Sequence, residues 1–173
     1  MMRRWLFPIL AGTVMAIGAY HATLLATPFA LMQAAIMKVG KQAPANQFAF
    51  SPMTTAENQT IVRPSPDLSY SVCAFDVSKG PVLVDVQPVP DHYWSVSIFD
   101  ARTDVAAVRS DRDTKGAPAR LALMKQGQTA PAGYDPVRVG YDRGLVLIRI
   151  LLSSPAEYPV VDAIRRKSTC KQL

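Results

Sequence analysis

The sequence predicts a mainly β protein, folded as an antiparallel sandwich or a barrel-like sheet, with a long N-terminal transmembrane helix and a short C-terminal helix. Strand-length apolar segments separated by Gly, Pro, Ser and Asp recur from residue 63 to residue 152. Residues 5–37 carry no Asp, Glu, Lys or Arg, as is typical of a membrane span. At 173 residues the chain has room for one domain and one anchoring segment.

The apolar N-terminal stretch predicts a membrane anchor over residues 1–41. Residues 5–26 carry no charge, and about 20 apolar residues cross the hydrocarbon layer as a helix. A cleaved signal peptide is the competing interpretation. Its apolar core would normally be about 7–15 residues long, and the nearest Ala-x-Ala triplet, Ala43–Ala45, lies well past the stretch. Apolar residues continue at helical spacing to Gly40, and we expect Pro28 to kink or split the helix.

The net charge of +6 comes largely from the two ends of this anchor. Arg3, Arg4, Lys38 and Lys41 flank it, and subtracting these four from 19 Lys and Arg leaves 15, against 13 Asp and Glu. A nearly neutral body argues against nucleic acid as a partner and for the lipid bilayer. The two N-terminal arginines favour a cytoplasmic N-terminus, with the body on the other side of the membrane.

Residues 42–62 are predicted to be a polar connection, and residues 63–173 the β domain. Pro44 and Pro52 break the connection, while Phe48 and Phe50 are expected to tuck into the domain. The triplet that begins at Asn58 fits a glycosylation acceptor.

The β domain is predicted from alternating strands. Apolar residues alternate over 68–74 and over 82–86, and residues 93–99 supply the bulkiest cluster of the chain. Further strands are expected at 105–109, 119–125, 137–141 and 144–152, the last with one internal charge, Arg149. After Ser154 and Pro155, apolar residues recur at helical spacing to Ile164, which predicts the closing helix.

The chain has two cysteines, Cys73 and Cys170. They are too few for a zinc site and do not form a Cys-x-x-Cys pair. In an oxidising compartment they could form a disulfide worth about 2–4 kcal/mol. The alternative is a buried thiol and an unrelated tail thiol. We expect no metal and no cofactor.

No catalytic motif is present, so candidate site residues come from polar positions in apolar surroundings. His21 lies in the apolar helix, where an interfacial position beside Tyr20 explains it, and His92 could act as a general base or as a turn residue. A larger set could form a buried hydrogen-bond network, in which Arg63 or Arg149 pairs with an Asp, or else a ligand site. This set is Arg63, Asp67, Ser69, Tyr70, Asp76, Asp100 and Arg149.

Three segments resemble the bacterial family called domain of unknown function 1254. They are Val62–Ser71, Asp76–Val82 and Tyr93–Asp104, and residues 142–149 resemble it more weakly. The resemblance implies a mainly β domain in the bacterial envelope, and it brings no accepted activity or catalytic residues. It makes the glycosylation triplet irrelevant. Longer members continue into a domain of unknown function 1214, which suggests that a separate protein of that type is a partner here.

The leading hypothesis is therefore a bacterial inner-membrane protein with one transmembrane helix and a periplasmic β domain that acts as a binding or assembly module. A second hypothesis is a subunit of an envelope enzyme, with a polar pocket that includes His92, Asp100 or Arg63. A third is a cleaved, secreted protein. A cleft with convergent polar groups would favour the enzyme, and an exposed sheet face or edge would favour the module.

Overall fold

The computed structural model describes residues 2–55 and 64–173, with side chains from Trp5 onward. A long helix, α1 (Met2–Gly40), precedes a β domain that ends with a short 3-10 helix, η1 (Pro155–Glu157), and α3 (Tyr158–Arg165). A further short helix, α2 (Asp111–Thr114), follows the fifth strand. The strands are β1 (Phe48–Phe50), β2 (Leu68–Asp76), β3 (Val82–Val86), β4 (Trp94–Phe99), β5 (Val105–Ser110), β6 (Ala119–Met124), β7 (Asp135–Arg138), β8 (Arg143–Leu151) and β9 (Thr169–Gln172).

The strands form two sheets packed face to face as a sandwich rather than a closed barrel. Sheet A has the order β1-β2-β8-β4-β5, and all its pairs are antiparallel. Sheet B has the order β7-β6-β3-β9, in which only β6 and β7 run parallel. The parallel pair follows from the loop 125–134, which packs Ala130 and Tyr134 on the outer face of sheet B.

The core lies between the sheets because alternate side chains of each strand point inward. Trp94, Val96 and Ile98 of β4 face it together with Val146, Ile148 and Ile150 of β8, and all six are at most 1% exposed. The bulky segment 93–99 therefore anchors the core, as its sequence predicted. Val82, Val84 and Val86 face it from sheet B.

The predicted disulfide is present between Cys73 of β2 and Cys170 of β9, with an S–S distance of 2.09 Å. The two strands belong to different sheets, so the bond crosses the core. Both cysteines are almost fully buried.

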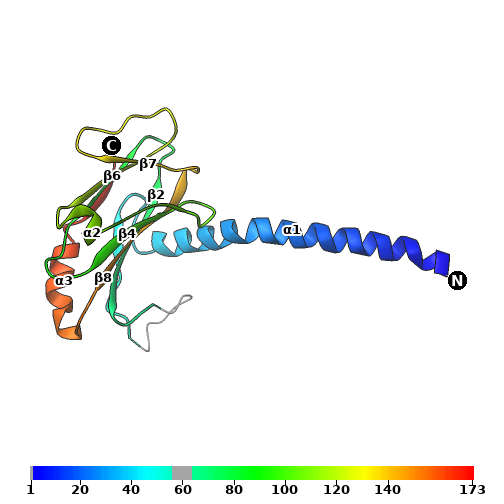
Figure 1. Cartoon of the computed structure of the whole chain (residues 1–173), viewed down its shortest axis with the longest axis horizontal. Coiled ribbons are helices and arrows are strands. Elements are labelled where there is room, and N and C mark those ends of the chain that lie inside the picture. Colours follow the sequence, from blue (N-terminus) through cyan, green and yellow to red (C-terminus); the bar gives the residue numbers. More distant parts are fainter. Residues whose placement is uncertain (1, 56–63) are drawn as a thin grey trace.

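The N-terminal helix continues without interruption through Pro28 to Gly40, so it is not split there. Its last turns contact β2 and β8 on the outer face of sheet A. Met32 is 5% exposed at this contact, and Phe29 packs edge-to-face on Tyr141. Earlier turns project away from the domain (Figure 1). The helix is long and apolar enough over Trp5–Gly40 to cross a membrane.

Two strands escaped the sequence prediction. β1 lies inside the expected connection 42–62, where Phe48 pairs with Cys73 of β2, and β9 lies in the tail after the closing helix. Each has at most four residues, which is too short for a visible alternation. β7 begins at Asp135, two residues before the expected strand.

Candidate functional site

The outer face of sheet A is partly covered by the end of α1 and partly open. Its more exposed part lies on β5 and beside the ends of β4 and β8, in the strand order β8-β4-β5. Four large apolar side chains there or at the strand ends are 41–56% exposed. They are Tyr93, Val105, Val108 and Leu151. We call this region the outer face patch.

A polar row crosses this patch. Arg149 of β8 pairs in register with Tyr70 of β2 on one side and with Ser95 of β4 on the other. Register partners project to the same face of a sheet, so the Arg149 side chain leaves the sheet on the same face as those of Tyr70 and Ser95. Arg149 Nη2 reaches Ser97 Oγ at 3.4 Å, whereas its Nε is buried without a hydrogen-bond partner.

Tyr70 is occupied by structural contacts. Its hydroxyl accepts a hydrogen bond from the backbone N–H of Ser65 at 2.9 Å. Its carbonyl accepts one from Arg165 Nη1 at 2.6 Å. Tyr70 therefore helps to fix the chain that leads into β2, and both of its polar groups are engaged within the domain.

His92 lines a separate surface pocket of about 460 Å³ at the start of β4. Pro88–Trp94 form most of its wall, together with Asp111 and Gly116. His92 Nε2 lies 3.0 Å from Glu157 Oε2, and Nδ1 lies 2.7 Å from the carbonyl oxygen of Pro90. Both neighbours are hydrogen-bond acceptors, so each ring nitrogen faces an oxygen.

Glu157 is the charged partner in this pair. The backbone N–H of Ser153 stabilises its carboxylate most, and together with His92 it outweighs partial burial and holds the pKa of Glu157 below its usual value. The pair ties the connection before β4 to the helix η1.

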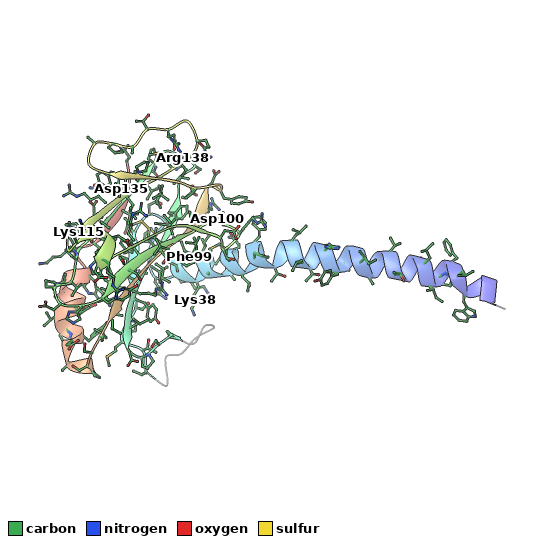
Figure 2. All side chains as sticks on the ribbon, viewed as in Figure 1. Lys38, Phe99, Asp100, Lys115, Asp135 and Arg138 are labelled. Carbon is green, nitrogen blue, oxygen red and sulfur yellow. A yellow bond between two sulfur atoms is a disulfide. The ribbon has the colours of Figure 1, made fainter. Side chains whose placement is uncertain are left out.

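Asp100 lies at the other end of β4 and shares no pocket with His92. Eight residues of extended chain separate them by roughly 26 Å. The Asp100 carboxylate accepts hydrogen bonds from the backbone N–H groups of Arg102 and Asp104, at 2.8 and 3.1 Å, and so shapes the β4–β5 turn. Figure 2 shows Asp100 beside Phe99 at the end of the domain from which α1 projects.

Asp76 has a similar structural role at the end of β2. Arg143 Nε donates to its carboxylate at 2.8 Å, and the backbone N–H of Ser78 donates at 2.9 Å. Burial raises the pKa of Asp76, but these bonds outweigh it and the pKa falls below its usual value. Asp67 is exposed, and its carbonyl accepts from the backbone N–H of Leu152. Arg63 and Asn58 lie outside the described residues.

The buried arginine of this fold is Arg165, which the sequence analysis treated only as part of the closing helix. Its side chain is 0% exposed. Nε donates to Asp162, Nη1 to Tyr70 O and Ser71 Oγ, and Nη2 to Ser51 O and Tyr158 Oη. The guanidinium also lies 5.4 Å from the Phe50 ring centroid. A buried Arg brace was predicted, but with Arg63 or Arg149 in its centre.

Metal ligands are not gathered anywhere in the described ranges 2–55 and 64–173. No three His, Cys, Asp or Glu side chains there lie close enough to hold one ion.

Comparison with solved structures shows the same fold in larger proteins. The VPA0106 protein from Vibrio parahaemolyticus matches with a TM-score of 0.67 and 18% identity, over 86% of this chain and 35% of that one. An uncharacterized protein from Burkholderia cenocepacia matches with a TM-score of 0.52 and 14% identity, over 80% of this chain and 37% of that one. The chain therefore spans about a third of the length of these proteins. No curated protein matches it.

The family comparison covers most of the β domain. The family model described as a protein of unknown function (DUF1254) matches residues 45–172, from the turn before β1 through β9. This range contains both sheets, the disulfide and the Arg165 brace, and it excludes α1. The chain belongs to the DUF1254 family.

Proposed function

We propose that this protein is a single-pass inner-membrane protein of bacteria, whose β domain lies in the periplasm and acts as a binding or assembly module. The observation that carries this proposal is the double role of α1. Its last turns pack on sheet A, while its apolar remainder, from Trp5 to Thr27, has almost no protein contact. An apolar helix surface of this size in water would be strongly unfavourable, and a bilayer removes it from water.

The periplasmic location is supported by the disulfide. Disulfides persist in the bacterial periplasm and are rare in the cytosol. The bond from Cys73 to Cys170 crosses the core of the domain. The arginines at positions 3 and 4 favour the matching orientation, with the N-terminus in the cytoplasm.

The binding role is supported by the outer face patch. Its exposed apolar side chains lie next to strand β5, which forms an edge of sheet A. Exposed apolar surface beside an edge strand is a common docking site for another chain. The family resemblance suggests a separate protein with a domain of unknown function 1214 as the partner.

Membrane topology can be tested directly. We expect the native protein to stay in the membrane fraction after alkaline carbonate washing, and its intact mass to include residue 1. A reporter enzyme that is active only in the periplasm should work when fused after Leu173. A soluble mature protein that begins after residue 28 would instead establish the cleaved, secreted form.

The binding role can be tested with a photo-crosslinking amino acid placed at Val108 of the patch, which is 45% exposed. The matched control is Val160 of α3, which is 64% exposed on another surface. We expect a discrete adduct from position 108 and none from position 160. Equal labelling from both positions would refute a specific docking surface.

The His92 pocket favours a second candidate, an envelope enzyme subunit. Among the described residues, His92 lines this pocket and its Nε2 lies 3.0 Å from the carboxylate of Glu157. His92→Gln keeps a polar side chain of similar size, but its amide cannot exchange a proton at neutral pH. If the second candidate is correct, this variant loses a function in cells that Arg138→Gln on β7 retains.

A further inference from the structure

Arg149 carries a positive charge that no carboxylate of the described residues pairs with. It lies on β8, the central strand of sheet A, and its side chain is half-buried. None of the ion pairs within residues 5–55 and 64–173 includes it. Its one hydrogen bond, to Ser97 Oγ, is long at 3.4 Å. A half-buried charge without a partner costs folding free energy. The binding of a ligand or partner that pairs with Arg149 would offset this cost.

A second polar atom beside Arg149 is also incomplete. Ser95 is its register partner on β4 and is only 2% exposed, yet Ser95 Oγ has no hydrogen-bond partner. A buried, unsatisfied polar group costs about 1–3 kcal/mol. Guanidinium N–H groups can only donate, and a serine hydroxyl can donate as well. The group missing from this spot is therefore an acceptor, and a negatively charged acceptor satisfies both residues best.

The Arg149 side chain can move because its hydrogen bond to Ser97 is weak. At 3.4 Å it is close to the limit of a hydrogen bond, so little is lost when the guanidinium turns outward. Its Nε and Nη2 can then present two parallel donors, the arrangement that binds the oxygens of a phosphate group.

The position of the domain relative to the bilayer suggests one source of phosphate. The last turns of α1 contact β2 and β8, and β8 is the strand that carries Arg149. The rest of α1 projects away from the domain (Figure 1). The bare part of the helix, Trp5–Thr27, is about 34 Å long at 1.5 Å per residue. The hydrocarbon core of a bilayer is about 30 Å thick. The end of the β domain at which α1 enters therefore lies next to the headgroup layer, where lipid phosphates are concentrated.

We propose that Arg149, Ser95 and Ser97 form a phosphate-binding subsite on the outer face of sheet A. The phosphate comes from a lipid headgroup or from solution. This inference rests on the proposed membrane-anchored binding function and names the chemistry that its surface recognises.

The test uses the full chain with two kinds of probe. In the first arm, inorganic phosphate is titrated into protein in a neutral detergent, and the ¹H–¹⁵N signals of arginine Nε–H groups are followed. In the second arm, native mass spectrometry counts the lipids retained by protein released from nanodiscs of phosphatidylglycerol and phosphatidylcholine. The variant is Arg149→Gln, and the matched control is Arg138→Gln on β7 of the other sheet. Circular dichroism confirms that both variants fold.

We expect the Arg149 signal to shift with phosphate, or phosphatidylglycerol to be retained, and Arg149→Gln to weaken that response at least tenfold. Arg138→Gln should bind as the native protein does. A response in the first arm only identifies free phosphate, and one in the second arm only identifies the lipid headgroup. Equal binding by Arg149→Gln and the native protein, or no response in either arm, overturns the subsite.

Failure of the subsite can be told apart from failure of the proposed function. If the subsite alone is wrong, the adduct from position 108 and membrane retention persist while both phosphate arms stay silent. If the proposed function is wrong, the adduct or membrane retention is lost, whatever the phosphate arms give.

Discussion

Among the glycines of this domain, Gly144 has the least space for an added Cβ atom. A Cβ atom at this position would lie 2.1 Å from the carbonyl oxygen of Phe99 and 2.7 Å from the ring of Phe75. The obstacle includes backbone of the neighbouring strand, which cannot move without disturbing sheet A. Gly144 is needed for the close approach of β8 to β4.

We expect Gly144→Ala to destabilise the domain by about 1–3 kcal/mol or more, the range for overpacking a core. Thermal unfolding of the full chain in detergent would measure the loss. Gly140→Ala is the control, because a Cβ there meets its nearest neighbour, Asp100, at 3.9 Å. Equal melting temperatures for the two variants would contradict the close approach.

Arg165 is the residue on which the contact between α3 and sheet A depends. Its five N–H groups all have acceptors, spread over α3, β2 and the end of β1. Arg165→Met should cost about 3–5 kcal/mol, because Asp162 and the buried carbonyls lose their partner. Arg165→Lys should rescue little, since one ammonium cannot reach the same acceptors.

The neighbouring Arg166 supplies the control for this prediction. Its side chain is 53% exposed and bonds the same Asp162. An exposed ion pair contributes about 1 kcal/mol or less, so Arg166→Met should change chemical unfolding only slightly. If both methionine variants unfold at the same denaturant concentration, Arg165 is not the brace.

Asp162 links this brace to pH. Burial raises the pKa of its carboxyl, but the hydrogen bond from Arg166 and the charge of Arg165 outweigh burial and lower the pKa below 3.8. A carboxyl with a lowered pKa in the folded state stabilises the fold above its unfolded pKa, and this stability disappears as pH falls through the folded value. We expect Asp162→Asn to lose less stability than the native protein between about pH 5 and about pH 3. Parallel pH curves in thermal melts would show that Asp162 does not contribute.

At the scale of elements, α1 is one continuous helix that is long and apolar enough to cross a membrane and whose end packs on the domain. The turn around Met32 packs on sheet A, whereas Leu31 is 60% exposed. The position of each side chain follows from helical geometry, since residues three and four apart share a face. The domain is therefore packed on the end of α1 and does not hang from a loose tether.

We expect Met32→Ala to loosen this packing, with a loss of about 2–5 kcal/mol for a buried methionine. Hydrogen exchange of residues 28–40 in nanodiscs would report it as faster exchange, and Leu31→Ala should leave exchange unchanged. Equal protection in both variants would mean that the end of α1 is not part of the domain.

Several elements could be predicted from their own residues. β8 is a run of apolar residues bounded by Arg143 and Ser153, and the closing helix follows from Pro155 and the spacing of Tyr158, Val161 and Ile164. β1 and β9 could not be predicted, because a short strand is stabilised by the strand beside it rather than by its own pattern.

At the scale of the whole molecule, the disulfide holds the two sheets together across 97 residues of sequence. Removing it with the pair Cys73→Ala and Cys170→Ala should cost about 2–4 kcal/mol. A reductant should lower the melting temperature of the native protein and leave that of the double variant unchanged. Two alkylatable thiols in the unreduced, unfolded native protein would contradict the bond.

The candidate site was predictable only as a set of residues. Arg149 stood out as a charge within an apolar strand, and His92 as a histidine outside the helix. Which of these residues share a face depends on strand order and register. The structure brings Arg149 beside Ser95 and Tyr70, and it separates His92 from Asp100 by the length of β4.

The amino-acid order alone determined the apolar helix, the β class and the family, because each follows from patterns within one stretch of chain. Only the tertiary structure decided that the sheets form an open sandwich, that Arg165 is the buried brace and that Arg149 has no counter-ion among the residues that the structure describes. These three depend on pairings between segments far apart in the chain, and local patterns carry no information about which distant strand becomes a neighbour.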